Sequence, residues 1–127
     1  SFATTWGNLS KVKTNLFMEE ITVQEFKNKL DNETPDVFLL DVRETFEQYQ
    51  SKIDYENSKL IPVGELQSRL DELESQKDSE IVCMCRSGVR SEQACKLLEK
   101  EGFADVKNLK GGINEWAREI DTSLPVY

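Results

Sequence analysis

The sequence predicts an α/β domain with a central, mostly parallel sheet and helices on both of its faces. Short apolar runs alternate with segments whose apolar residues recur at helical spacing, and this alternation favours parallel strands joined by helical crossovers. The apolar runs at residues 37–40 and 81–84 are almost continuous, as in strands covered on both faces. A chain of 127 residues is long enough for one such domain with its own core.

The beginning of the domain is predicted from a helix-start signal. Residues 1–18 show no clean apolar period, and we interpret them as a linker or N-terminal extension before a domain that spans residues 19–127. A short strand at residues 20–22 leads into Thr22 and Glu25, whose spacing is that of a capping box. The helix that follows is expected to place Phe26 and Leu30 on one face.

The first long apolar run ends in polar residues at the carboxyl edge of the predicted sheet. These residues are Asp41 and Arg43. Strand-end charges of this kind either form an ion pair that ties the strand to its loop or line the rim of a pocket. Residues 44–52 are expected to form a short helix with Phe46 and Tyr49 facing inward.

An edge strand and another helix are predicted next. Residues 60–63 suit a short strand at an edge or end, because Pro62 cannot donate to a ladder. Residues 64–73 are expected to be a helix, with three leucines at helical spacing.

The second long run leads into Cys85, which is expected at the carboxyl end of a central strand. Ser87 and Gly88 break the strand, and a helix is predicted from Ser91 up to a stop at Gly102. Open α/β sheets place their ligands at this kind of junction.

The last elements are a strand and a helix. Residues 106–109 are the expected strand, and a glycine pair at residues 111–112 turns the chain. Ile113 and Trp116 lie on one face of the final helix, with Trp116 in the core, and the chain leaves through a tail from Asp121 onward.

Composition excludes several function classes. With 24 acidic and 16 basic residues the formal net charge is −8, so a nucleic acid is not an expected partner. No apolar run approaches a membrane span. The absence of histidine from the sequence removes Ser-His-Asp, Cys-His and His-metal mechanisms, and no metal or other cofactor is expected. Three cysteines do not make a disulfide framework and favour a reducing cytoplasm.

Cys85 is the candidate nucleophile. A thiol reacts as its thiolate, and positive charge, helix-start N–H groups and a glycine-containing loop all favour that anion. The alternative is that Cys85 is a small buried hydrophobe, the role we assign to Cys83 and Cys95. The loop that would bind an anionic substrate consists of Arg86, Ser87, Gly88, Val89 and Arg90. Its two arginines supply charge in this interpretation, although such residues also serve simply to solubilise a loop.

Three motifs resemble the rhodanese family of sulfurtransferases. Residues 41–44 (DVRE) look like a family signature, residues 85–91 (CRSGVRS) look like its active-site loop, and residues 111–116 (GGINEW) resemble its terminal element. The three motifs occur in the same order as in the family, and the resemblance covers about residues 19–127. The resemblance implies a rhodanese-like fold and a Cys85 persulfide, formed from thiosulfate or a protein persulfide and attacked by a second nucleophile. Asp41 and Arg43 would support this site.

The resemblance extends to the carboxyl end and weakens in the middle. Residues 116–127 are similar to the tail of rhodanese domains fused behind an adenylyltransferase, which implies a ubiquitin-like sulfur carrier as acceptor, in molybdopterin, thiamine or tRNA thiolation. In that case the chain is an excised C-terminal domain. Residues 51–62 lack the histidine and glycines of many relatives, which changes a loop but leaves the cysteine motif intact.

Three other functions compete with sulfur transfer. A cysteine phosphatase or arsenate reductase is disfavoured by the spacing Cys-x4-Arg between Cys85 and Arg90, because the related phosphatases carry Cys-x5-Arg. A non-catalytic binding module is disfavoured by the intact cysteine. A redox sensor would use Cys83 or Cys95 to resolve an oxidised Cys85.

Overall fold

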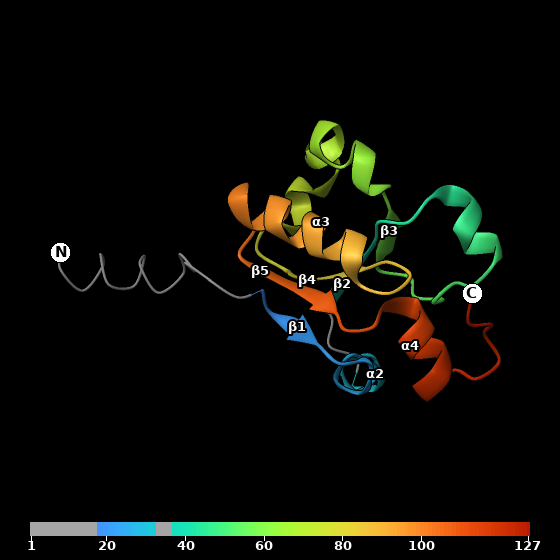
Figure 1. Ribbon diagram of the computed structural model, residues 1–127. Helices are drawn as coiled ribbons and strands as arrows, with labels where there is room; N and C mark the ends of the chain where they lie inside the picture. The colour runs from blue at the N-terminus through green and yellow to red at the C-terminus, as the bar shows by residue number, and fades with distance from the viewer. Residues whose placement is uncertain (1–17, 33–36) are drawn as a thin grey trace, which may run out of the picture.

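The computed structural model describes residues 18–32 and 37–127, which form one sheet covered by helices (Figure 1). Within these residues the strand order is β1-β5-β4-β2-β3, and every neighbouring pair is parallel, which confirms the predicted architecture. The strands are β1 (Glu20–Ile21), β2 (Val37–Asp41), β3 (Ser58–Leu60), β4 (Glu80–Met84) and β5 (Asp105–Leu109). The helices are α2 (Val23–Asp31), α3 (Val89–Lys100) and α4 (Gly112–Glu119), with 3-10 helices η1 (Thr45–Tyr49), η2 (Val63–Glu65) and η3 (Gln67–Gln76).

Each face of the sheet has its own apolar core. On one face α2 and α4 pack together, and the rings of Phe26 and Trp116 lie 5.7 Å apart. On the other face α3, η2 and η3 cover the sheet, and Figure 1 shows α3 on the opposite side from α2 and α4. Successive residues of β2 alternate between the two cores, Leu39 on the first and Leu40 on the second. This double burial explains why the central strands are apolar at nearly every position.

The helices α2 and α3 begin with different N-terminal caps. At α2 the Thr22 hydroxyl accepts from Glu25 N–H at 3.0 Å, and the Glu25 carboxylate accepts from Thr22 N–H at 3.0 Å, so the predicted capping box is confirmed. At α3 the helix begins at Val89, two positions before the predicted start. Gly88 provides its N-cap in the left-handed region, with φ of 109°, which lets the chain turn directly from the loop into the helix.

The prediction for residues 44–52 was wrong about which side chains are buried. The helical part is only η1, and the side chains of Phe46 and Tyr49 are 66% and 89% exposed. The residue that turns inward is Glu47, which is 6% exposed. Its carboxylate is paired with Arg90, so burial of the charge is compensated and the aromatic rings take the solvent side.

The segment around residues 58–76 also differs in detail from the prediction. The edge strand is β3 and ends before Pro62, which lies at the N-cap of η2 with φ of −54°. The predicted helix of residues 64–73 is divided into η2 and η3, and Arg69 inside η3 has the non-helical φ of −121°. The N-terminal extension predicted at residues 1–18 lies outside the described residues except for Met18. None of the helices in the described ranges has the length and apolarity needed to cross a bilayer.

Candidate active site

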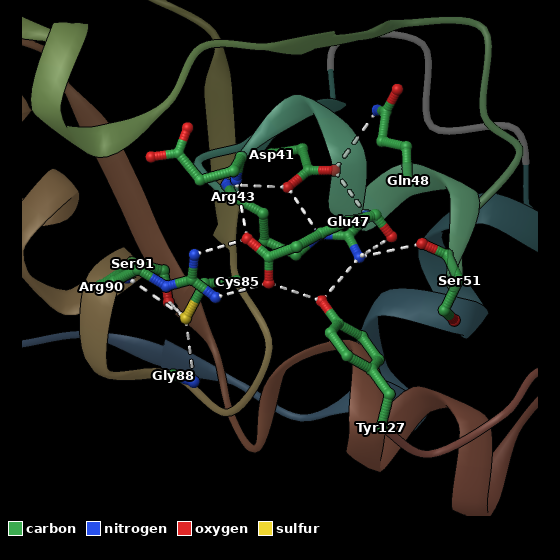
Figure 2. Close-up of polar contacts among 11 residues, drawn as sticks. Asp41, Arg43, Glu47, Gln48, Ser51, Cys85, Gly88, Arg90, Ser91 and Tyr127 are labelled. Carbon is green, nitrogen blue, oxygen red and sulfur yellow. Dashed lines mark hydrogen bonds and ion pairs between the residues drawn. The ribbon is translucent and has the colours of Figure 1, made fainter.

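Cys85 lies directly after β4, where several hydrogen-bond donors converge on its sulfur (Figure 2). Gly88 N–H donates to Cys85 Sγ at 3.0 Å, and Ser91 N–H donates at 3.4 Å. The Ser91 hydroxyl lies 3.2 Å from the sulfur and can donate to a thiolate or accept from a thiol. Cys85 is 1% exposed, and this burial acts to raise its pKa. The Ser91 hydroxyl and the loop N–H groups outweigh burial, so the pKa of Cys85 lies below the usual thiol value.

The first turn of α4 holds the backbone of the loop around Cys85. Ile113 N–H donates to the Cys85 carbonyl at 2.9 Å, and Asn114 N–H donates to the Arg86 carbonyl at 3.1 Å. This approach requires glycine at residue 112, which has φ of +64° and where a Cβ atom would lie 2.5 Å from the Cys85 carbonyl oxygen. The glycine pair at residues 111–112 therefore belongs to the same site as the cysteine loop.

A polar residue of β5 braces the loop from the side, and the sequence analysis missed it. Asn108 is 4% exposed, and its Nδ2 donates to the Gly88 carbonyl at 3.0 Å. Its Oδ1 accepts from the Ser91 hydroxyl while Cys85 is a thiol, and the single hydroxyl proton can turn to the sulfur when Cys85 ionises. The available signal was an amide in a buried strand that runs beside β4 and ends at the same edge of the sheet.

Replacing Ser91 with alanine is expected to raise the pKa of Cys85, because the variant loses the hydroxyl that stabilises the thiolate. The thiolate fraction at a given neutral pH then falls. Ultraviolet thiolate absorbance, titrated against pH, measures the shift, with a Cys85→Ser protein as the blank. A midpoint that stays in place or moves to lower pH contradicts this account of the sulfur's surroundings.

Arg90 lies in the site, but a carboxylate engages it. Its Nη1 and Nη2 donate to Glu47 Oε2 and Oε1 at 2.7 and 2.9 Å. These bonds, together with the Glu44 N–H and Tyr127, lower the pKa of Glu47 to about 2 despite its burial. The structure thus pairs one of the two loop arginines with a glutamate from η1. The sequence analysis did not identify that glutamate as a site residue.

Asp41 and Arg43 form an ion pair that ties the end of β2 to the following loop. The Arg43 side chain is fully buried, and its Nη2 lies 2.7 Å from Asp41 Oδ2. Its Nη1 also donates to the Ser51 carbonyl at 2.8 Å and to the Glu47 carbonyl at 3.3 Å. The ion pair that was one reading of these residues is present, and it anchors the segment that carries Glu47.

The tail brings an unpredicted side chain to the site. The Tyr127 hydroxyl donates to Glu47 Oε1 at 2.8 Å and accepts from Arg43 Nη1 at 3.0 Å, as Figure 2 shows. The Arg86 guanidinium carbon lies 5.0 Å from the centre of the Tyr127 ring. The sequence analysis treated this residue as part of an exit tail, because its partners lie far away in the chain.

The remaining cysteines are in packing positions. Cys83 and Cys95 are fully buried in the core that α3 covers, and the three cysteines are free. The neighbouring Cys95 and burial together raise the pKa of Cys83 well above its usual value. Among the described residues, no group of histidine, cysteine, aspartate and glutamate is arranged to hold a metal ion. Cys85 is therefore the thiol whose surroundings favour a reactive anion.

Comparison with known proteins gives matches over most of the chain. The family model described as the rhodanese-like domain matches residues 22–119. The adenylyltransferase and sulfurtransferase MOCS3-2 of Zea mays is 34% identical over 112 residues, covering 84% of this chain and 23% of the maize protein. The sulfurtransferase of Allochromatium vinosum is 38% identical over 109 residues, covering 86% of this chain and 94% of that protein. The human single-domain sulfurtransferase TSTD1 has a TM-score of 0.67 at 26% identity, covering 81% of this chain and 98% of the human one. The chain thus spans less than a quarter of the maize relative and nearly all of the bacterial one.

Proposed function

Because this chain belongs to the rhodanese-like domain family, we propose that it is a sulfurtransferase in which Cys85 carries the sulfur as a persulfide. The observation that carries the proposal is the set of N–H donors aimed at Cys85 Sγ, from Gly88 at 3.0 Å and Ser91 at 3.4 Å. Donors in this arrangement stabilise a negative charge on sulfur in a site that excludes bulk water.

The first half-reaction loads the cysteine. The Cys85 thiolate attacks the outer sulfur of thiosulfate or of a protein persulfide, a new S–S bond forms, and the donor's own S–S bond breaks. Sulfite or the donor thiolate leaves with the electron pair, so no external oxidant is needed. Since Cys85 is only 1% exposed, the donor has to be narrow at the transferred sulfur, as both of these donors are.

The second half-reaction removes the sulfur from Cys85. An acceptor nucleophile attacks the outer sulfur, and Cys85 leaves as a thiolate. Val89 and Arg90 precede the first intrahelical bond of α3, from Glu92 N–H to the Gly88 carbonyl at 3.2 Å, so their N–H groups are free of helical partners. In the proposal the N–H groups of Val89 and Arg90, together with Ser87, hold the outer sulfur. Residues 86–90 are then the substrate-binding loop. The ion pair of Asp41 and Arg43 supports this loop.

The proposed acceptor is the C-terminal glycine of a ubiquitin-like sulfur carrier that an adenylyltransferase has activated. The tail resemblance and the 34% identity to the maize protein named for both activities support this choice. Molybdopterin formation, thiamine formation and tRNA thiolation are the pathways that use such carriers, and the expected setting is a reducing cytoplasm. With this acceptor the outer sulfur of the Cys85 persulfide attacks the activated carboxyl carbon and AMP leaves. A dithiol then reduces the remaining S–S bond, which releases the thiocarboxylate and the Cys85 thiol as the dithiol is oxidised to its disulfide. Incubation of the persulfide form with an adenylated carrier and a dithiol is therefore expected to convert the carrier to a thiocarboxylate, which intact mass measures.

Mass spectrometry of the thiosulfate-treated protein tests the sulfur-transfer proposal. The intact protein is expected to gain one sulfur atom, and cyanide is expected to remove it as thiocyanate. Fragmentation should place the added sulfur on Cys85, with Cys83 and Cys95 as internal controls in the same protein. No gain from either thiosulfate or a low-molecular-weight persulfide would reject the proposal, and so would sulfur found on Cys83 or Cys95.

The competing functions give different readouts from the same protein. A phosphatase or arsenate reductase releases phosphate from an aryl phosphate or consumes arsenate, and neither reaction is expected here. A redox sensor forms an internal disulfide between Cys85 and Cys83 or Cys95 after mild peroxide treatment. A binding module takes up no sulfur at all.

A further inference from the structure

We propose that Tyr127 is a positioning residue for the sulfur donor, acting through Arg86, which its ring holds beside the cysteine loop. This inference rests on the proposed sulfur transfer and deepens it. It assigns to the tail a part in binding the anionic donor, and it distinguishes the roles of the two loop arginines.

The argument begins with the charges of those arginines. Arg90 is bound through two bonds by Glu47, so its positive charge is matched within the protein. Arg86 is exposed, and its guanidinium lies over the Tyr127 ring with the carbon 5.0 Å from the ring centre. An aromatic face attracts a cation without neutralising it. Of the two loop arginines, Arg86 is therefore the one whose charge remains available to an incoming anion.

Tyr127 is itself fixed at both its backbone and its hydroxyl. Its N–H donates to Asn114 Oδ1 at 3.1 Å, and Asn114 Nδ2 donates to its carbonyl at 3.4 Å. Asn114 also holds the Arg86 carbonyl through its own N–H at 3.1 Å. One residue of α4 thus sets the positions of both the ring and the loop residue that stacks on it.

The Tyr127 hydroxyl makes a second set of contacts, away from Arg86. It contacts Glu47, the partner of Arg90, and Arg43, which lies in the buried ion pair. The ring and the hydroxyl therefore have separable tasks: the ring restrains Arg86, and the hydroxyl joins two ion pairs. A long exposed arginine otherwise samples many rotamers, and restraining it reduces the entropy lost when an anion binds.

Steady-state kinetics with thiosulfate as donor and cyanide as acceptor test the proposal. Tyr127→Leu, which lacks the ring, is expected to raise the KM for thiosulfate about threefold with kcat within about twofold of wild type. Tyr127→Phe keeps the ring, and its KM is expected to stay near the wild-type value although the hydroxyl is lost. Arg86→Gln is expected to raise KM about tenfold, as loss of a charge-assisted contact does.

The double variant gives the decisive comparison. In an Arg86→Gln background, Tyr127→Leu is expected to have no further effect on KM, because the residue through which it acts is gone. An equal rise in KM in both backgrounds, an unchanged KM in Tyr127→Leu, or an equal rise in Tyr127→Phe would overturn the assignment. If Tyr127→Leu does not fold, Tyr127→Met takes its place in the same cycle. Failure of sulfur transfer itself is recognised separately, because the wild-type protein then shows neither turnover nor a persulfide.

Discussion

Replacement of Cys85 with serine is expected to reduce sulfur transfer by more than about a thousandfold, the scale on which loss of a nucleophile acts in covalent catalysis. A serine hydroxyl cannot form the persulfide, and the lowered pKa that favours the Cys85 thiolate has no counterpart in an alcohol. The side chains are nearly the same size, so the loop bonds from Gly88 and Ser91 have an acceptor in the variant as well. The rate of thiocyanate formation from thiosulfate and cyanide is the measurement.

Cys95→Ala provides the matched control for this variant. Cys95 belongs to the same apolar core as Cys85, but the N–H groups of Gly88 and Ser91 donate to the sulfur of Cys85. Cys95→Ala is expected to keep its transfer activity and lose only some stability from a small cavity. Retained activity in Cys85→Ser, or its loss in a folded Cys95→Ala protein, would contradict the assignment of the nucleophile.

Replacement of Arg43 with leucine is expected to destabilise the protein by about 3–5 kcal/mol, which is a large part of the free energy of unfolding of a domain this size. The guanidinium is fully buried and donates to Asp41 at 2.7 Å and to the Ser51 carbonyl at 2.8 Å. In the variant the Asp41 carboxylate, 4% exposed, loses its counter-charge, and the carbonyls lose their donor. Urea unfolding followed by tryptophan fluorescence, to which the core residue Trp116 contributes, measures the change.

A second substitution separates the lost charge pair from simple loss of volume. In the double variant Asp41→Asn, Arg43→Leu the buried carboxylate is gone, so part of the stability is expected to return. If the double variant is less stable than Arg43→Leu by the full cost of Asp41→Asn alone, the two side chains are not coupled. The buried ion pair would then not be the cause of the destabilisation.

The parts of the molecule that sequence reasoning described well are those with strong local patterns. The continuous apolar run of β4, the glycine in the loop and the helical spacing of α3 place Cys85 at a strand-to-helix junction without any reference to distant residues. The capping box at Thr22 is equally local. These features are determined by neighbours within a few residues, and so a single sequence is enough to predict them.

The errors and omissions concern residues whose partners lie far along the chain. Phe46 and Tyr49 were expected on the inward face of a short helix, but Glu47 takes the inward position to meet Arg90, 43 residues later. Tyr127 reaches Arg43 across 84 residues, and no periodicity in a tail signals such a contact. Asn108 braces a loop 20 residues earlier. Pairings between polar groups of this kind carry no local signature, so they become visible only in the folded chain.

The pairing of the first strand with the last one determines when the domain can be completed during its synthesis. Glu20 lies opposite Asn108 and Ile21 opposite Leu109, so within the described residues β1 gains its strand partner only after residue 109 has left the ribosome. Until then the edge of β4 that β5 will cover is open as well, because β5 joins both strands. A nascent chain that stalls before β5 therefore exposes the unpaired edge of the apolar strand β4, which is the kind of surface that aggregates.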